Sequence, residues 1–345
     1  MSKHTTIRNR SGTVSILIEN KAVFVFILLF CSSLLLFVIG LSVGSTMINP
    51  LLILQHLLGM GNGEHSFVLE TLRLPRMILA FLAGICLAVS GLILQGVVRN
   101  PLASPDIIGI TGGGAVAAVL FITYFSEYSI KLLPFIVIIG AGVVSLFIYV
   151  LAWKKGVTPI RLVLIGIGVQ AAMGAIVTML MVLSPTYSTS EAYIWLTGSV
   201  YGANWNNVYS MLPWVLIFVP LSLLLSRKVN VQELGDDLAQ GLGLKVQLTR
   251  FGLICISVAL AGAAVAFAGG IGFVGLIAPH IARKLVGRSF GSLVPVSALV
   301  GGIIVVLADI VARTAFLPMD LPAGVFVSGI GAPFFIYLLY KNRNM

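Results

Sequence analysis

Residues 270–286 read GIGFVGLIAPHIARKLV, an apolar stretch that Pro279 and His280 interrupt. A helix that crosses the hydrocarbon core of a bilayer needs about 20 residues, because the core is roughly 30 Å thick and each residue rises about 1.5 Å. The apolar piece 273–286 is too short for a full crossing. Broken helices are tolerated at membrane depth where protein or a cavity surrounds them. We therefore count this piece as a re-entrant or half-length span.

Nine longer apolar runs accompany this piece. Together they predict an all-α polytopic membrane protein of about ten transmembrane helices. The runs lie near residues 22–43, 76–98, 107–125, 132–153, 160–183, 209–226, 250–269, 293–316 and 321–340. We expect one transmembrane domain over residues 1–345, with a polar N-terminal tail over 1–21 and a long polar loop over 227–250.

The composition indicates the same class of protein. Of the 345 residues, 59% are hydrophobic and 9% are charged, whereas a soluble domain carries about 25% charged residues. So few charges cannot cover a globule of this size, which excludes a soluble enzyme, a nucleic-acid-binding protein and a disordered chain. The 37 glycines are frequent within the apolar runs, where small residues let helices pack closely in lipid.

The basic residues predict the orientation, because cytoplasmic loops carry an excess of Lys and Arg. Ten spans place both termini on one side of the membrane. On that model the outer segments hold four basic residues, Arg73, Arg76, Lys131 and Arg313. The inner segments hold the other 17, namely Lys3, Arg8, Arg10, Lys21, Arg99, Lys154, Lys155, Arg161, Arg227, Lys228, Lys245, Arg250, Arg283, Lys284, Arg288, Lys341 and Arg343. We therefore expect both termini to be cytoplasmic.

Ionisable groups within the spans are scarce, which limits the possible transport mechanisms. Only Asp309 lies inside an apolar run, and Arg313 follows it as an i,i+4 partner. One paired aspartate is a poor proton or sodium relay. An ion-coupled secondary transporter, which would use Asp309 and the polar side chains of Gln95 and Gln170, is the alternative function.

The sequence lacks motifs for nucleotide hydrolysis, catalysis or metal binding. A P-loop requires a Gly-Lys dipeptide, and none occurs. The four histidines share no metal-ligand spacing, and no serine–histidine or HExxH arrangement is present. We expect a transport subunit without enzyme activity, cofactor or metal, so its energy must come from another polypeptide.

Several motifs follow one another in a specific order. Together they resemble the permease family of ABC importers for iron–siderophores, haem and vitamin B12, over about residues 73–339. The motifs are Arg73-Leu-Pro-Arg76, Ser90-Gly91 with Gln95, Arg99-Asn-Pro-Leu102, Gly272-Phe-Val-Gly-Leu276 with Pro279-His280 and Arg283, Ala308-Asp309 with Arg313, Leu321-Pro322, and Gly331-Ala-Pro-Phe334. One departure is Asp320, which stands where the family usually has glutamate before Leu-Pro; its position also predicts a cap for the last helix.

The resemblance implies a type II ABC importer permease in a bacterial cell membrane, carrying an iron(III)–siderophore complex. It implies three kinds of protein partner: a second permease subunit in a homo- or heterodimer, two cytoplasmic ATPases, and an extracytoplasmic substrate-binding protein.

The resemblance also assigns roles to residues. Arg73, Arg76 and Arg313 are expected to receive acidic residues of the binding protein. A pair of short helices is expected to couple to the ATPase, over Glu233, Leu234, Gly235, Asp236, Asp237, Leu238, Ala239, Gln240, Gly241, Leu242 and Gly243. From their polarity and position we add Gln95, Gln170, Pro279 and His280 as candidates for the pathway or gate.

Overall fold

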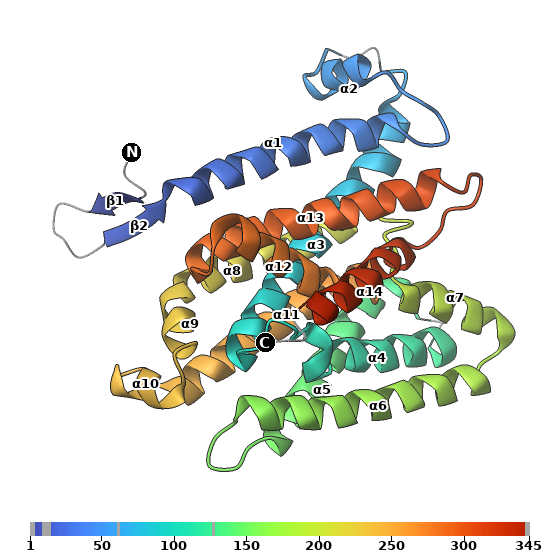
Figure 1. Ribbon diagram of the computed structural model, residues 1–345. Helices are drawn as coiled ribbons and strands as arrows, with labels where there is room; N and C mark the ends of the chain where they lie inside the picture. Colours follow the sequence, from blue (N-terminus) through green and yellow to red (C-terminus); the bar gives the residue numbers. More distant parts are fainter. Residues whose placement is uncertain (1–3, 9–14, 61–62, 126–127, 342–345) are drawn as a thin grey trace.

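The computed structural model describes residues 4–8, 15–60, 63–125 and 128–341, and it is overwhelmingly helical (Figure 1). The expected helical fold is therefore confirmed. The predicted polar tail additionally contains an antiparallel hairpin of strands β1, His4–Arg8, and β2, Ser15–Glu19, with His4 opposite Glu19. The hairpin leads directly into the first long helix, and the sequence pattern did not predict it.

The helices follow the apolar runs closely. They are α1 Asn20–Ser42, α2 Pro50–Leu57, the π-helical turn η1 Phe67–Arg73, α3 Leu74–Val98, the 3-10 turn η2 Pro105–Ile108, α4 Ile110–Tyr124, the 3-10 turn η3 Ile130–Leu132, α5 Leu133–Leu151, α6 Pro159–Leu183, α7 Thr186–Thr197, α8 Trp205–Leu224, α9 Ser226–Gln232, α10 Asp236–Gly241, α11 Val246–Ala268, α12 Val274–Val286, α13 Phe290–Thr314 and α14 Ala323–Lys341. The short helices α2 and α7 were not predicted.

Seven helices in the described part of the chain are long and apolar enough to cross a membrane, so the predicted number of about ten spans is not confirmed. They are α1, η1 with α3, η3 with α5, α6, α8, α11 and α13. The apolar stretches of α4 and α14 are shorter, at Ile110–Tyr124 and Ala323–Tyr337. The 15 residues of α4 extend about 22 Å, less than the hydrocarbon thickness of roughly 30 Å. The predicted run 107–125 is shortened because Gly109, with φ of 71°, ends η2 before α4 begins.

The piece 273–286 forms the short helix α12, of 13 residues. Its N-cap, Phe273, has a left-handed φ of 63°, which is unusual for a bulky side chain. The chain therefore turns sharply between α11 and α12, and α12 is half-length, as expected from its length in the sequence.

Helix α3 forms the centre of the molecule and packs against α13, α11, α12 and α8 (Figure 1). Almost all of its side chains between Met77 and Val97 are buried. Glycines allow its neighbours to approach at backbone distance. A Cβ atom on Gly84 would lie 2.2 Å from the Gly301 carbonyl oxygen of α13, and one on Gly91 would lie 2.1 Å from that of Gly275 in α12. At these positions glycine permits the close helix packing that its frequency predicts.

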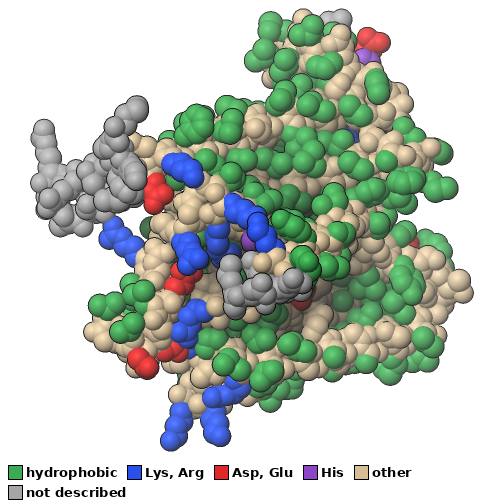
Figure 2. Space-filling view, viewed as in Figure 1, with side chains coloured by type: hydrophobic (Ala, Val, Ile, Leu, Met, Phe, Trp, Pro, Cys, Tyr) green, Lys and Arg blue, Asp and Glu red, His purple; other side chains and the backbone are tan. Residues whose placement is uncertain are grey.

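Helices α1 and α6 lie at opposite edges of the molecule, and both leave much of their surface uncovered (Figure 1). In α6 only Leu162, Gly166 and Leu180 are buried. Basic side chains gather at the side of the molecule that carries α9 and α10, whereas hydrophobic side chains cover much of the remaining face (Figure 2). The charged side is the one that the basic residues predict to be inner.

Candidate functional site: two polar networks

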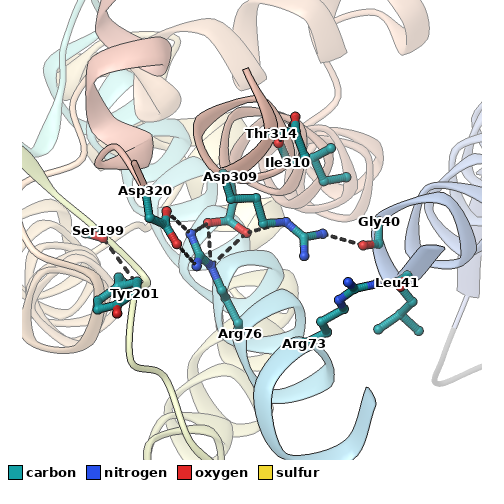
Figure 3. A network of polar contacts seen from close by, with 11 residues as sticks. Gly40, Leu41, Arg73, Arg76, Ser199, Tyr201, Asp309, Ile310, Thr314 and Asp320 are labelled. Carbon is teal, nitrogen blue, oxygen red and sulfur yellow. Dashed lines mark hydrogen bonds and ion pairs between the residues drawn. The ribbon is translucent and has the colours of Figure 1, made fainter. Parts of the chain in front are cut away.

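One polar network surrounds Arg76, near the start of α3 (Figure 3). Its Nε donates to both oxygens of Asp309, at 2.9 and 3.2 Å. Its Nη1 and Nη2 donate to the two oxygens of Asp320, at 2.5 and 2.8 Å. A single arginine thus binds two carboxylates through its planar fork, an arrangement that lysine could not reproduce. The ring of Tyr201 lies 5.7 Å from the Arg76 Cζ atom.

Arg76 is the closer partner of Asp309, and the predicted partner Arg313 is more distant. The Asp309 carboxylate, only 1% exposed, lies 2.8 Å from Arg76 Nη2 but 3.8 Å from Arg313 Nε. Asp320 was expected to cap the last helix, and both of its oxygens instead accept from Arg76. These pairings join residues more than 230 positions apart, so sequence spacing did not reveal them.

The other two arginines of this network bind the end of α1 and the connection that follows it. Arg73 donates to the carbonyl oxygens of Leu41 and Thr46, each at 2.5 Å, and Arg313 donates to that of Gly40. The structure thus brings the three arginines together. It also buries them, since Arg73, Arg76 and Arg313 are 5%, 9% and 8% exposed.

A second network joins the loops at the side that carries α10. The Asp236 carboxylate accepts from Arg99 at 2.8 Å and from Arg250 at 2.8 and 3.0 Å. Arg250, which is fully buried, also donates to the carbonyl oxygen of Val157 in the α5–α6 connection. Gln247 of α11 accepts from the Val157 N–H at 3.0 Å.

The expected coupling segment, residues 233–243, contains one short helix, α10, and the other short helix, α9, ends at Gln232 just before it. Three leucines at i, i+4 and i+8 are prominently exposed here: Leu234 by 57%, Leu238 by 63% and Leu242 by 67%. Ala239, by contrast, is fully buried. Desolvation raises the pKa of the Glu233 carboxyl, although the charges of Arg283 and Arg288 act in the opposite direction.

Three of the four pathway candidates lie on α3 and α12. Gln95 donates to the carbonyl oxygen of Gly275 at 3.1 Å and accepts from Arg283 at 2.5 Å, so it connects both ends of α12 to α3. Pro279 is buried within α12, and the His280 ring meets the Phe334 ring of α14 edge-on at 5.7 Å. Gln170 instead lies on α6, against Gly112 of α4.

A cavity of about 890 Å³ opens among the start of α5, helix α7, the start of α8 and the end of α11. Trp195 and Tyr201 contribute aromatic surface, and Asn204, Asn206 and Asn207 contribute amides. Among the described residues, no cluster of three or more His, Cys, Asp or Glu side chains could hold a metal ion.

Comparisons with known proteins identify close relatives. The model of the FecCD transport family matches residues 30–341. A protein of Bacillus subtilis named a probable siderophore transport system permease is 48% identical over 332 residues, which cover 94% of this chain and 97% of the relative. The achromobactin transport system permease of Dickeya dadantii is 49% identical over 308 residues, 89% of this chain and 88% of the relative. A solved metal-chelate type ABC transporter in an inward-facing conformation matches with a TM-score of 0.81 and 31% identity, covering 92% of this chain and 99% of that one.

Proposed function

The chain belongs to the FecCD transport family, and from this premise we propose that it is the permease of an ATP-driven importer that carries ferric siderophores into the cell. It is a transport subunit of the multi-pass membrane type, and ATP hydrolysis belongs to a separate subunit. The alternative, an ion-coupled transporter that uses Asp309, is not supported, because Arg76 binds and neutralises that carboxylate. The Bacillus subtilis relative is named a probable siderophore transport system permease, which favours this substrate class.

The exposed leucines in α10 and directly beside it are the observation that carries the ATP-driven mechanism. Leu234, Leu238 and Leu242 project from a short polar segment that is rich in charged neighbours and too short to enter a membrane. Apolar groups exposed together on such a segment mark a protein-binding surface. We assign this surface, residues 233–243, to the ATPase.

We place both termini and the α9–α10 segment in the cytoplasm. The support is the excess of Lys and Arg in the segments on that side, together with their gathering beside α9 and α10 in Figure 2. The Arg76 network then lies at the extracytoplasmic end. Binding of the substrate-binding protein at the α10 side would overturn this orientation.

The uncovered face of α6 suits a second permease subunit, either an identical copy or a related chain. Exposed small residues, Gly168, Ala171 and Ala175, recur along it between the larger Leu164 and Val182. In lipid, such small residues let two helices approach closely. The exposed residues of α1 are large instead, such as Phe24 and Leu35, and suit contact with lipid chains.

We propose the Arg76 end as the docking site of the substrate-binding protein. Arg73, Arg76 and Arg313 already bind internal acceptors, so a carboxylate from outside can reach Arg76 only where Asp320 now lies. Asp320 is 26% exposed in its side chain, which leaves it accessible to exchange. Docking would therefore replace the Asp320 carboxylate with one from the partner.

Asp320→Asn should tighten binding of the substrate-binding protein. The variant removes the internal competitor for Arg76 and leaves one more positive charge at the surface, worth about two- to fivefold in affinity for a partly exposed pair. The affinity is measured with the permease complex in nanodiscs, and the gain should disappear at high salt. Unchanged or weaker binding at low salt would reject the exchange of carboxylates.

The function itself is tested by uptake in a strain that lacks this gene. Radiolabelled ferric siderophores, haem and cobalamin are supplied one at a time to cells with the wild-type permease, with a Leu234→Asp/Leu238→Asp variant or with empty vector. We expect accumulation of a ferric siderophore with the wild type only. Uptake of haem or cobalamin alone would correct the substrate class, and uptake that persists without cellular ATP would reject the mechanism.

A further inference from the structure

We infer that Asp236 is a positioning residue that transmits movement of the ATPase from α10 to α3, α11 and the α5–α6 connection. The inference rests on the proposed function, because it assumes that the ATPase binds the exposed leucines in α10 and directly beside it. Asp236 was grouped by sequence with the residues expected to couple to the ATPase. Its contacts in the structure are instead directed into the permease.

The Asp236 carboxylate joins α10 to α11, the next helix along the chain, and to α3, which is distant in sequence. It is the first residue of α10, and its Oδ1 accepts from Arg99, which ends α3, at 2.8 Å. The same oxygen accepts from Arg250 of α11 at 2.8 Å, and Oδ2 accepts from Arg250 at 3.0 Å. Charge-assisted hydrogen bonds of this kind are about twice as strong as neutral ones. Helix α10 is thereby fixed to α3 and α11, two of the most deeply buried spans.

Burial makes the Arg250 side of this contact rigid. The Arg250 side chain is 0% exposed, and a buried guanidinium requires an anion and further acceptors. Asp236 supplies the anion, and the carbonyl oxygen of Val157 accepts from the second amino group. Arg250 therefore has no solvated alternative position to which it could relax when α10 moves.

The contact extends to the uncovered helix α6. Gln247, less than one turn before Arg250 on α11, accepts from the Val157 N–H at 3.0 Å and donates to the Val157 carbonyl oxygen at 3.4 Å. Val157 is buried, and only Thr158 separates it from the start of α6. A displacement of α10 is thus delivered through Asp236 and Arg250 to the start of α6, the helix that we assign to the partner permease.

The test separates transmission from docking by measuring two quantities in proteoliposomes with the purified transporter complex. These are the amount of ATPase bound per permease and the amount of siderophore transported per ATP hydrolysed. Asp236→Asn keeps the shape of the side chain but removes its charge. We expect normal binding of the ATPase and about a tenfold lower ratio of transport to hydrolysis, with partial rescue by Asp236→Glu.

Arg99→Gln removes the partly exposed partner and should lower the same ratio. The double variant Asp236→Asn/Arg99→Gln should be no worse than Asp236→Asn alone, because both changes break one contact. Lys154→Gln, which removes an exposed cation of the α5–α6 connection, is the matched control and should leave the ratio unchanged.

Two results would contradict the inference. A ratio within about twofold of wild type for Asp236→Asn rules out transmission, and loss of bound ATPase with an unchanged ratio makes Asp236 a docking residue. If Asp236→Asn does not accumulate in the membrane, the ratio of transport to hydrolysis measured for Arg99→Gln tests the inference in its place. Failure of the wild-type permease to bind an ATPase would instead reject the proposed function.

Discussion

Arg76→Met should remove most of the folded permease from the membrane. Arg76 binds Asp309 and Asp320 at distances down to 2.5 Å, and Asp309 is 1% exposed. Without it the buried Asp309 carboxylate keeps only Arg313, at 3.8 Å. A buried charge that loses its partner costs about 3–5 kcal/mol, a large part of a typical stability of about 5–15 kcal/mol. Membrane abundance of a fluorescent fusion, and its melting temperature after detergent extraction, measure the loss.

A triple variant tests the physical reason. Arg76→Met/Asp309→Asn/Asp320→Asn removes the cation together with both anions, so no unpaired charge remains and abundance should recover relative to Arg76→Met. Lys131→Met removes an exposed cation from the same side and should leave abundance unchanged. Wild-type abundance and melting temperature in Arg76→Met would show that the network does not stabilise the fold.

Leu234→Asp/Leu238→Asp should abolish ATP-driven uptake while the permease remains folded. Both leucines are more than half exposed, so the substitutions bury no new charge within the permease. At a protein interface, central apolar anchors each contribute about 2 kcal/mol or more, and a charge placed there adds a desolvation cost. We expect loss of the ATPase from the purified complex and uptake at background level.

Leu58→Asp is the matched control. Leu58 is 71% exposed, but it directly follows α2, which lies at the far end of the molecule from α10 (Figure 1). It should retain the full amount of bound ATPase. An intact complex in the Leu234→Asp/Leu238→Asp variant would exclude this surface as the ATPase site. Ala239→Pro is a less selective probe, since Ala239 is buried and its N–H donates to the Gly235 carbonyl oxygen.

The positions of the long helices could be predicted from the sequence, because a long run of apolar residues is typical of a helix that crosses a membrane. All nine long runs fall on helices, and the half-length piece became α12. The length of α4 was less predictable, because a turn such as that at Gly109 shortens a helix without interrupting the apolar composition. Hydropathy therefore locates membrane segments better than it counts complete crossings.

The polar networks depended on tertiary contacts that spacing does not encode. The i,i+4 rule proposed Arg313 as the partner of Asp309, but Arg76 of a different helix is nearer. The same limitation applies to Asp236, whose charge predicted contact with a partner and whose carboxylate binds Arg99 and Arg250 instead. Charge identifies a residue as functional in a membrane protein, and packing determines with what it interacts.

The burial of α3 has a mechanical consequence. Its 25 residues form a rod about 38 Å long, with the Arg76 network at one end and the Arg99–Asp236 contact at the other. Close backbone contact at Gly84 and Gly91 joins α3 to α13 and α12. Any tilt of α3 therefore moves the three helices together as one rigid body. A tilt of about five degrees about one end displaces the other by roughly 3 Å, a typical amplitude for rigid-body switching. A rigid-body tilt of α3 together with α12 and α13 would therefore carry a displacement from one side of the membrane to the other.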